Sequence, residues 1–406
     1  MKNKLIYALS LVLLLPLLLF GCVKKYQFEM PDSVYTLPVD KVAEENKSVV
    51  DKDDNQYFGH SDTVMTTNGD IYCFYVKGHG KGALKMKKSS DFGRTWSEDL
   101  ATPSSWENSN ETPTIYGLDF QDGSRKYILI TGVPGWGKDG GGFATSISTD
   151  ECKTFSEFTY YYDQYVGDED ELGDYHKAIV AMASLTHLKD ADGNYIDKWM
   201  GVYHNYDFIN YKTYLTFDEN GNEQWSKPEP YLSQWRDIEK EANLCEVEMV
   251  RSPDGKEIML LARANAHKSN SYSSISTDEG MTWSEPKELF NEITGERHKA
   301  EYDAKTGKLL VSFRGMYRDG NNMSPSGWIG WIGEYSDIRA FLDDDPDNDI
   351  VKGKNIVFSH EYNPSDVGGY AGVVADGNGN FNVVGYGNFD MDCNNPYILS
   401  VIYSVE

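Results

Sequence analysis

A spaced motif recurs along the chain and constrains the fold more than any other feature of the sequence. It reads Ser-x-Asp-x-Gly-x-Thr-Trp at residues 89–96 and again at 276–283, and an altered copy with Cys and Phe stands at 148–155. A looser member with longer spacing runs over residues 216–225. The copies recur about every 60 residues, which is typical of a protein built from repeated structural units.

The residue types of the motif suit a turn better than a catalytic centre. Asp91, Asp150, Asp218 and Asp278 stand where a side-chain oxygen can accept backbone N–H groups, and the glycine of the intact copies tolerates positive φ where the chain reverses. The closing Trp or Phe can fill the space between neighbouring strands. We therefore interpret the motif as a structural turn that marks each repeated unit.

Between the motifs the chain consists of short apolar runs separated by turn residues. Runs rich in Val, Ile, Leu, Tyr and Phe occur at residues 71–76, 127–130, 258–261 and 309–313, and pairs such as Asn68-Gly69 and Asp254-Gly255 stand between runs. This pattern predicts an all-β protein. Units of about 60 residues with about four strands each indicate a β-propeller, and residues 56–406 leave room for about six blades.

The N-terminal region has the composition of a secretory signal. Residues 1–4 are basic, and the apolar run over 5–20 is shorter than the roughly 20 residues needed to cross a bilayer. Residues 19–22 resemble the lipobox of bacterial lipoproteins, which implies removal of residues 1–21 and acylation of Cys22. We expect residues 22–55 to form a flexible tether. The protein would then be exported and held at a membrane, facing the periplasm or the cell surface, through the lipid alone.

Charge and cysteine content exclude several classes of protein. The formal net charge of −26 argues against nucleic acid or an anionic lipid surface as the main partner. Cys73, Cys152, Cys245 and Cys393 are scattered without a C-x-x-C spacing, so we expect mostly buried free thiols. The acidic run at 341–350 lacks the spacing of a calcium loop and reads as a surface loop. No metal or cofactor is expected.

The repeated motif resembles the Asp-box of the sialidase superfamily, and the resemblance covers nearly all of residues 57–406. It implies a six-bladed β-propeller with the box between the third and fourth strands of a blade, on the face away from the active site. It also implies a glycan partner. Because Asp-boxes occur in binding modules as well as in enzymes, the fold by itself does not decide the activity.

Three residues match positions that carry chemistry in sialidases. Glu246 stands seven residues before Pro253, which opens a Pro-Asp-Gly turn, and Arg263 ends the following apolar run. Tyr370 stands nine residues before Gly379, where that family has a nucleophilic tyrosine. The resemblance implies that Glu246 accepts the Tyr370 proton and that Arg263 binds a substrate carboxylate. The alternatives are a structural ion pair for Glu246 and Arg263, and plain packing for Tyr370.

The sequence also departs from the sialidase pattern. Gly59 stands where the family has its first arginine, and the loop at 77–82 contains His79 but no carboxylate to serve as the acid. The candidates for a general acid are Asp62, Asp366 and His79. The remaining expected substrate-binding residues are Arg297, Arg314, His60 and His79. Trp136 could stack on a sugar, although its position favours packing at the edge of a blade.

These observations favour an exported, sialidase-like glycoside hydrolase that releases a terminal sugar, acidic or otherwise unusual, from glycans. One alternative is a glycan-binding propeller without catalysis, because the first arginine and the acid Asp are missing. A second is a polysaccharide lyase on the same fold, in which His79 and Tyr370 transfer protons beside a uronate carboxylate.

Overall fold

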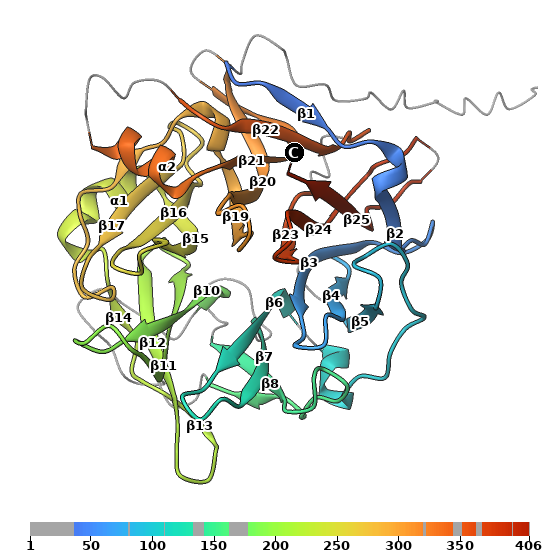
Figure 1. Cartoon of the computed structure of the whole chain (residues 1–406), viewed down its shortest axis with the longest axis horizontal. Coiled ribbons are helices and arrows are strands. Elements are labelled where there is room, and N and C mark those ends of the chain that lie inside the picture. The colour runs from blue at the N-terminus through green and yellow to red at the C-terminus, as the bar shows by residue number, and fades with distance from the viewer. Residues whose placement is uncertain are drawn as a thin grey trace, which may run out of the picture.

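The computed structural model describes residues 36–79, 82–108, 110–132, 142–161, 178–319, 322–343, 351–362, 368–391 and 393–405. In this part the chain forms six sheets that surround a central axis like blades, together with two short α-helices (Figure 1). This arrangement is a six-bladed β-propeller and confirms the predicted fold class. Residues 1–21, Cys22, Trp136 and Asp366 lie outside the described residues.

Each blade is an antiparallel sheet whose first strand lies nearest the axis, and the six first strands contact one another in ring order (Figure 1). Blade one contains β3 (Phe58–Met65), β4 (Ile71–Lys77) and β5 (Leu84–Ser89). Blade two contains β6 (Asn110–Asp119), β7 (Arg125–Gly132), β8 (Phe143–Ser148) and β9 (Thr159–Tyr160). Blade three contains β10 (Ala178–Lys189), β11 (Tyr195–Asn205), β12 (Asn210–Phe217), β13 (Glu223–Trp225) and β14 (Glu229–Pro230).

The second half of the propeller repeats the arrangement. Blade four contains β15 (Leu244–Arg251), β16 (Ile258–Ala264), β17 (Tyr272–Ser276) and β18 (Lys287–Glu288). Blade five contains β19 (Gly295–Tyr302), β20 (Leu309–Asp319), β21 (Asn322–Gly333) and β22 (Lys354–Ser359). Blade six contains β23 (Ala371–Ala375), β24 (Asn380–Gly387) and β25 (Tyr397–Ser404).

The helical segments are short and lie outside the inner strands. The α-helices are α1 (Arg236–Ala242) and α2 (Tyr335–Leu342), and the 3₁₀ turns are η1 (Glu44–Asn46), η2 (Ser104–Asn108), η4 (Ser233–Trp235) and η5 (Asn291–Ile293). Helix α2 begins with a reciprocal capping pair, Glu334 and Asp337, and packs Ile338 into the apolar core of blades four and five.

The apolar runs of the sequence become the second strands of the blades. The runs at 71–76, 127–130, 258–261 and 309–313 lie in β4, β7, β16 and β20, and most of their side chains are buried. A second strand is covered on both faces by the neighbouring blades, so an uninterrupted apolar run suits it better than an alternating one. The core is therefore a ring of apolar layers between blades.

The segment predicted to be a tether takes part in the fold. Strand β2 (Lys47–Asp51) pairs with β25 as the outer strand of blade six, and β1 (Val39–Lys41) adds in parallel to β22 of blade five. The prediction of a flexible tether is therefore wrong for residues 36–55. The segment is polar because an outer strand has solvent on one side, and that composition is hard to distinguish from a linker. Pairing β2 with the last blade closes the ring.

The repeated motif forms one kind of turn. Asp91, Asp150 and Asp278 each accept hydrogen bonds from the backbone N–H and the hydroxyl of the threonine four residues on, at 2.6–2.9 Å. The turns follow β5, β8 and β17, the third strands of their blades. In the altered copy Cys152 replaces the glycine and keeps positive φ, at 60°, so the turn survives at some cost in backbone energy.

These turns lie at the end of each blade opposite to Glu246 and Arg263. In blade four Cys245 pairs with Arg263 near one end, while Arg251 pairs with Ile258 at the other end. The turn that contains Asp278 follows from Ser276, which pairs with Ile258. The register therefore separates the repeated turns from the residues expected to carry chemistry.

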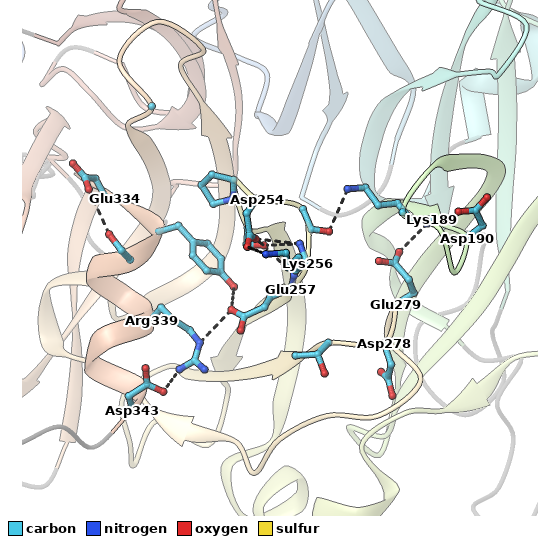
Figure 2. Close-up of a pocket in the computed structure, with 18 of the residues that line it drawn as sticks. Lys189, Asp190, Asp254, Lys256, Glu257, Asp278, Glu279, Glu334, Arg339 and Asp343 are labelled. Atoms are coloured by element: carbon cyan, nitrogen blue, oxygen red, sulfur yellow. Dashed lines mark hydrogen bonds and ion pairs between the residues drawn. The ribbon is translucent and has the colours of Figure 1, made fainter.

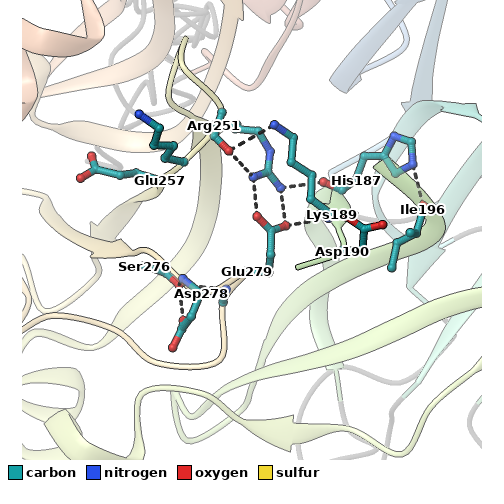
Figure 3. A network of polar contacts seen from close by, with 12 residues as sticks. His187, Lys189, Asp190, Ile196, Arg251, Glu257, Ser276, Asp278 and Glu279 are labelled. Atoms are coloured by element: carbon teal, nitrogen blue, oxygen red, sulfur yellow. Dashed lines mark hydrogen bonds and ion pairs between the residues drawn. The ribbon is translucent and has the colours of Figure 1, made fainter. Parts of the chain in front are cut away.

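A hollow of about 1400 Å³ opens at this turn end, between blades three, four and five (Figure 2). Its charged side chains are mostly paired: Glu279 binds Arg251, which does not itself line the hollow, at 2.6 Å, Arg339 binds Glu257 at 3.2 Å, and Lys189 Nζ donates to a backbone carbonyl (Figures 2 and 3). The contacts in Figure 3 also join Arg251 to the backbone of blade three. These charges hold neighbouring blades together, and the hollow lies far from Glu246 along the strands.

Cys73, Cys152, Cys245 and Cys393 are buried and are not joined in disulfide bonds within the described part of the chain, as predicted. Among the described residues no helix is long and apolar enough to cross a membrane. In the same part of the chain, no three His, Cys, Asp or Glu residues gather closely enough to hold a metal ion.

Candidate active site

Four inner strands carry a β-bulge near their first residues. In β3, β10, β15 and β19 the pairing with the second strand shifts register at this point, and β6 has a register shift as well but no residue with positive φ among those the structure describes. One residue of each of the four bulges has positive φ: His60 (54°), Met182 (49°), Glu246 (49°) and Arg297 (53°). Positive φ is unfavourable for these residue types, and a bulge re-aims a side chain. The same distortion in four blades therefore marks one end of the axis as a site where side-chain direction matters.

Glu246, Tyr370 and Arg263 meet at this end, although they come from blades four and six. Tyr370 Oη donates to Glu246 Oε1 at 2.5 Å. Arg263 Nη1 lies 3.0 Å from Glu246 Oε2 and 3.1 Å from Tyr370 Oη. Tyr370 and Glu246 are 7% and 4% exposed, so the contacts form in a site of low water content. The structure thus brings together the three residues that matched sialidase positions.

The protonation states of the pair suit proton transfer from Tyr370 to Glu246. Burial raises the pKa of Glu246, but the charges of Arg263 and Arg297 and the Tyr370 hydrogen bond outweigh it, so the pKa is lowered and the carboxylate is ionised. Burial and the nearby Glu246 charge raise the pKa of Tyr370 well above its ordinary value. A neutral phenol therefore faces an ionised base.

Glu296, which the sequence analysis did not single out, bridges two of the expected arginines. Its Oε1 lies 3.0 Å from Arg263 Nη2, and its Oε2 accepts from Arg314 Nη1 at 2.8 Å. His267 Nε2 lies 2.7 Å from the same Oε1. Burial raises the pKa of Glu296, but Arg263, the His267 hydrogen bond and Arg314 together lower it to about 2. Glu296 is a buried, ionised carboxylate between two cations.

Aromatic and cationic groups surround the ring of Tyr370. His60 stacks on it with ring centroids 5.2 Å apart, and Tyr386 meets it edge-on at 6.2 Å. The guanidinium groups of Arg314 and Arg297 lie 5.1 and 5.9 Å from its centroid. Burial and the nearby cations keep the pKa of His60 well below its ordinary value, so this imidazole is neutral. The ring is held firmly while its hydroxyl faces Glu246.

His79, another expected binding residue, lies at the edge of this cluster. Its ring centroid is 4.9 Å from that of His60, and its Nδ1 lies 2.9 Å from Tyr57 Oη. The His79 side chain is exposed, so it lies between solvent and the buried Tyr370. The structure therefore groups His79, His60 and the three arginines around the Glu246–Tyr370 pair.

Asp62, predicted to be catalytic, belongs to a separate cluster in the axis. Its carboxylate accepts from the backbone N–H groups of Thr63 (2.9 Å) and Ile115 (3.0 Å), and Lys299 Nζ lies 3.2 Å away. The bulge after Gly59 interrupts the alternation of side chains, so Asp62 does not share the direction of the stacked His60. Its oxygens are occupied by structural contacts, which leaves the exposed His79 as the better-placed acid candidate among the described residues.

Three residues of the site that were not predicted from the sequence, Glu248, Glu296 and Lys299, follow a spacing that repeats between blades. Glu246 and Glu248, Arg297 and Lys299, and His60 and Asp62 stand two residues apart on β15, β19 and β3. In each pair the first residue occupies the bulge and the second continues into the axis, where burial raises the pKa of Glu248 to about 7. Aligning the blades on this spacing could have identified Lys299 and Glu248, and Glu296 as the residue before the bulge.

A search by sequence found no matching family model and no similar curated protein. Solved structures with the same fold were found. A protein of unknown function from Dyadobacter fermentans matches with a TM-score of 0.61 at 14% identity, covering 90% of this chain and 99% of that one. An α-L-arabinanase from Penicillium chrysogenum, complexed with arabinobiose, matches with a TM-score of 0.54 at 10% identity, covering 88% and 98%.

An intramolecular trans-sialidase from Ruminococcus gnavus matches with a TM-score of 0.53 at 12% identity, covering 86% of this chain and 94% of that one. At these identities the likeness concerns the fold. The chain is thus similar in fold, over most of its length, to six-bladed propellers that include sialidases and arabinan-degrading glycoside hydrolases.

Proposed function

We propose that the protein is a glycoside hydrolase that releases a terminal sugar from a glycan, with Tyr370 as the nucleophile and Glu246 as its base. The observation that carries the proposal is the 2.5 Å hydrogen bond from the neutral Tyr370 hydroxyl to the ionised Glu246 carboxylate. A tyrosine nucleophile with a neighbouring carboxylate is the arrangement by which sialidases differ from other glycosidases.

The first step breaks the glycosidic bond. Tyr370 Oη attacks the anomeric carbon while its proton passes to Glu246 Oε1, and the departing oxygen leaves with the bonding electron pair. An acid, for which His79 is our candidate, protonates that oxygen. Arg263 contacts both Glu246 and Tyr370, and so stabilises negative charge as it moves from the carboxylate to the phenol oxygen.

The second step restores the enzyme. Water attacks the anomeric carbon and gives up a proton to the deprotonated acid, and the bonding electrons return to Tyr370 Oη. The phenol then recovers its proton from Glu246. Because the carbon is attacked twice, the released sugar keeps its anomeric configuration.

A substrate panel tests the proposal. We expect wild type to release sugar from at least one compound in a panel of α- and β-linked aryl glycosides, arabino-oligosaccharides and sialosides, and Tyr370→Phe to lose this activity. Tyr75→Phe is the matched control, since Tyr75 is also a buried tyrosine whose hydroxyl donates to a carboxylate at 2.5 Å, but in blade one. Full activity of Tyr370→Phe on a substrate of the wild type would contradict the assignment.

The same panel separates the alternatives. A glycan-binding propeller would retain a glycan without releasing sugar over long incubation. A lyase would produce an unsaturated sugar that absorbs in the ultraviolet. The hydrogen bond from Tyr370 to Glu246 favours the hydrolase, because a lyase needs its tyrosine and histidine beside the carboxylate of a uronate.

We expected the released sugar to be acidic, because the sequence offers Arg263, Arg297 and Arg314 to bind a carboxylate. Two of these arginines already bind Glu296, which argues against this expectation.

We also propose that the protein is exported and anchored through an acylated Cys22, on the basis of the signal-like residues 1–21.

A further inference from the structure

Two arginines at the candidate active site have the arrangement of an anion-binding subsite. Arg263 lies near the end of β16 and Arg314 lies within β20, the second strands of neighbouring blades, and they pair with Cys245 and Glu296 near the start of the inner strands. Both border Tyr370: Arg263 contacts its hydroxyl at 3.1 Å, and Arg314 lies over its ring. The space between these two guanidinium groups is therefore suited to a substrate carboxylate next to the reacting carbon.

That position is occupied by the protein itself. Glu296 places one carboxylate oxygen 3.0 Å from Arg263 and the other 2.8 Å from Arg314. The remaining nitrogens of Arg314 are also engaged, since Nε donates to the Gly368 carbonyl at 2.8 Å and Nη2 to Tyr386 Oη at 3.4 Å. All three nitrogens of Arg314 are thus engaged, and at Arg263 both Nη1 and Nη2 bind glutamates, so that Nε alone has no hydrogen-bond partner among the described residues.

A second carboxylate would also meet unfavourable charge. Glu296 is 3% exposed and ionised, and Glu246 lies 3.0 Å from Arg263. Bringing a third negative group into this buried set places like charges close together, which disfavours binding of an acidic sugar. The positive charge of both arginines is already matched by the two glutamates.

Arg297 does not restore a carboxylate subsite. It faces the Tyr370 ring at 5.9 Å, and its Nη1 has no hydrogen-bond partner among the described residues. Nη1 carries two N–H groups, which sugar hydroxyls or a ring oxygen can satisfy as well as a carboxylate can. Arg297 therefore suits a site that binds a neutral sugar.

We infer that Glu296 is a built-in carboxylate that fills the anion subsite, so that the site accepts a neutral sugar and excludes sugars with a carboxylate at the anomeric centre. The inference rests on the proposed hydrolase function and specifies its substrate class. Glu296 acts through Arg263 and Arg314 and is a specificity-determining residue.

Binding measurements test the inference without depending on catalysis. Wild type, Glu296→Gln and Glu296→Asp are titrated calorimetrically with N-acetylneuraminic acid and with the neutral sugars arabinose and galactose. We expect no detectable binding of the acid by wild type or Glu296→Asp. Glu296→Gln removes the charge in the same volume, and we expect it to bind the acid at least about tenfold more tightly than wild type.

A matched control excludes a general effect of charge. At pH 8, where Glu248 with its pKa of about 7 is mostly ionised, Glu248→Gln also removes a buried carboxylate from the adjacent blade, but Glu248 contacts the backbone of Ala300 rather than the arginine pair. We expect this variant not to gain acid binding, and circular dichroism establishes that each variant is folded. Should Glu296→Gln fail to fold, Glu296→Ala is titrated in its place, with the same expected gain.

The outcomes separate this inference from the proposed function. Tight binding of the acid by wild type, or no gain of acid binding in the folded Glu296→Gln variant, overturns the inference. So does hydrolysis of sialosides in preference to neutral glycosides. A gain of acid binding in Glu296→Gln supports it even when the substrate panel shows no hydrolysis, a result that would count against the proposed function alone.

Discussion

Glu361 is a buried acid beside the candidate active site, and it makes stability depend on pH. It is 1% exposed. Burial raises its pKa to about 8, although the charge of Arg314 and the backbone N–H of Gly368 act in the opposite direction. We predict that Glu361→Gln, which has nearly the same shape and no charge, removes this dependence.

The magnitude follows from the difference between the folded and unfolded pKa values. The ordinary value of 4.5 applies to the unfolded chain, against about 8 in the fold. Each unit corresponds to about 1.4 kcal/mol, so the whole shift amounts to on the order of 5 kcal/mol. Because the folded state holds the proton more tightly, the stabilising contribution is present below pH 4.5 and is lost as the pH rises to about 8.

The assay is urea denaturation of wild type and Glu361→Gln at a series of pH values between about 5 and 8. Other buried acids titrate in both proteins, so the difference in unfolding free energy isolates this group. We expect the difference to move in favour of the variant by a few kcal/mol across the range. The exposed Glu219→Gln serves as control. A difference that stays constant with pH would refute the reasoning, because Glu361 would then titrate alike in both states.

Three further predictions concern the base, the repeated turn and the anchor. Glu246→Gln should lower kcat about 10²–10⁴-fold on any substrate of the wild type, as expected for loss of a general base; a change of less than a few-fold would exclude that role. Asp278→Ala should lower the unfolding free energy by about 1–3 kcal/mol without altering kcat, since it removes hydrogen bonds at 2.6–2.8 Å from a turn at the far end of the blade. Urea denaturation measures the change in unfolding free energy, and initial rates measure kcat. Cys22→Ser should move the protein from the detergent phase to the aqueous phase on partitioning of bacterial cells that express it, whereas unchanged partitioning would argue against acylation.

Much of the fold could be predicted because the repeat spacing and the strand composition agree. The motif around Asp91 and Asp278 gave the unit length, and the apolar second strands gave the strand positions. The closure of the ring was missed. Strand β2 is polar and pairs with β25, which lies at the other end of the chain, and local composition does not report such a distant partner.

The candidate site was predicted in part. Glu246, Arg263 and Tyr370 were found through matches to a known pattern, and they do meet. The directions of Asp62 and Glu296 depend on bulges in β3 and β19, whose extra residues change which face a side chain takes. Side-chain alternation read from the sequence assumes a regular strand, and it fails at these positions.

The central claim, that Tyr370 is a nucleophile activated by Glu246, is tested most directly by trapping the covalent intermediate. The substrate found in the panel defines the sugar, and its 2-deoxy-2-fluoro glycosyl fluoride is incubated with wild type and Tyr370→Phe before peptide mass spectrometry. We predict that wild type gains the mass of one fluorinated glycosyl group on the peptide that contains Tyr370, and that the variant gains none. An adduct on another residue such as Glu296, or turnover of the substrate with inverted anomeric configuration, would contradict the claim.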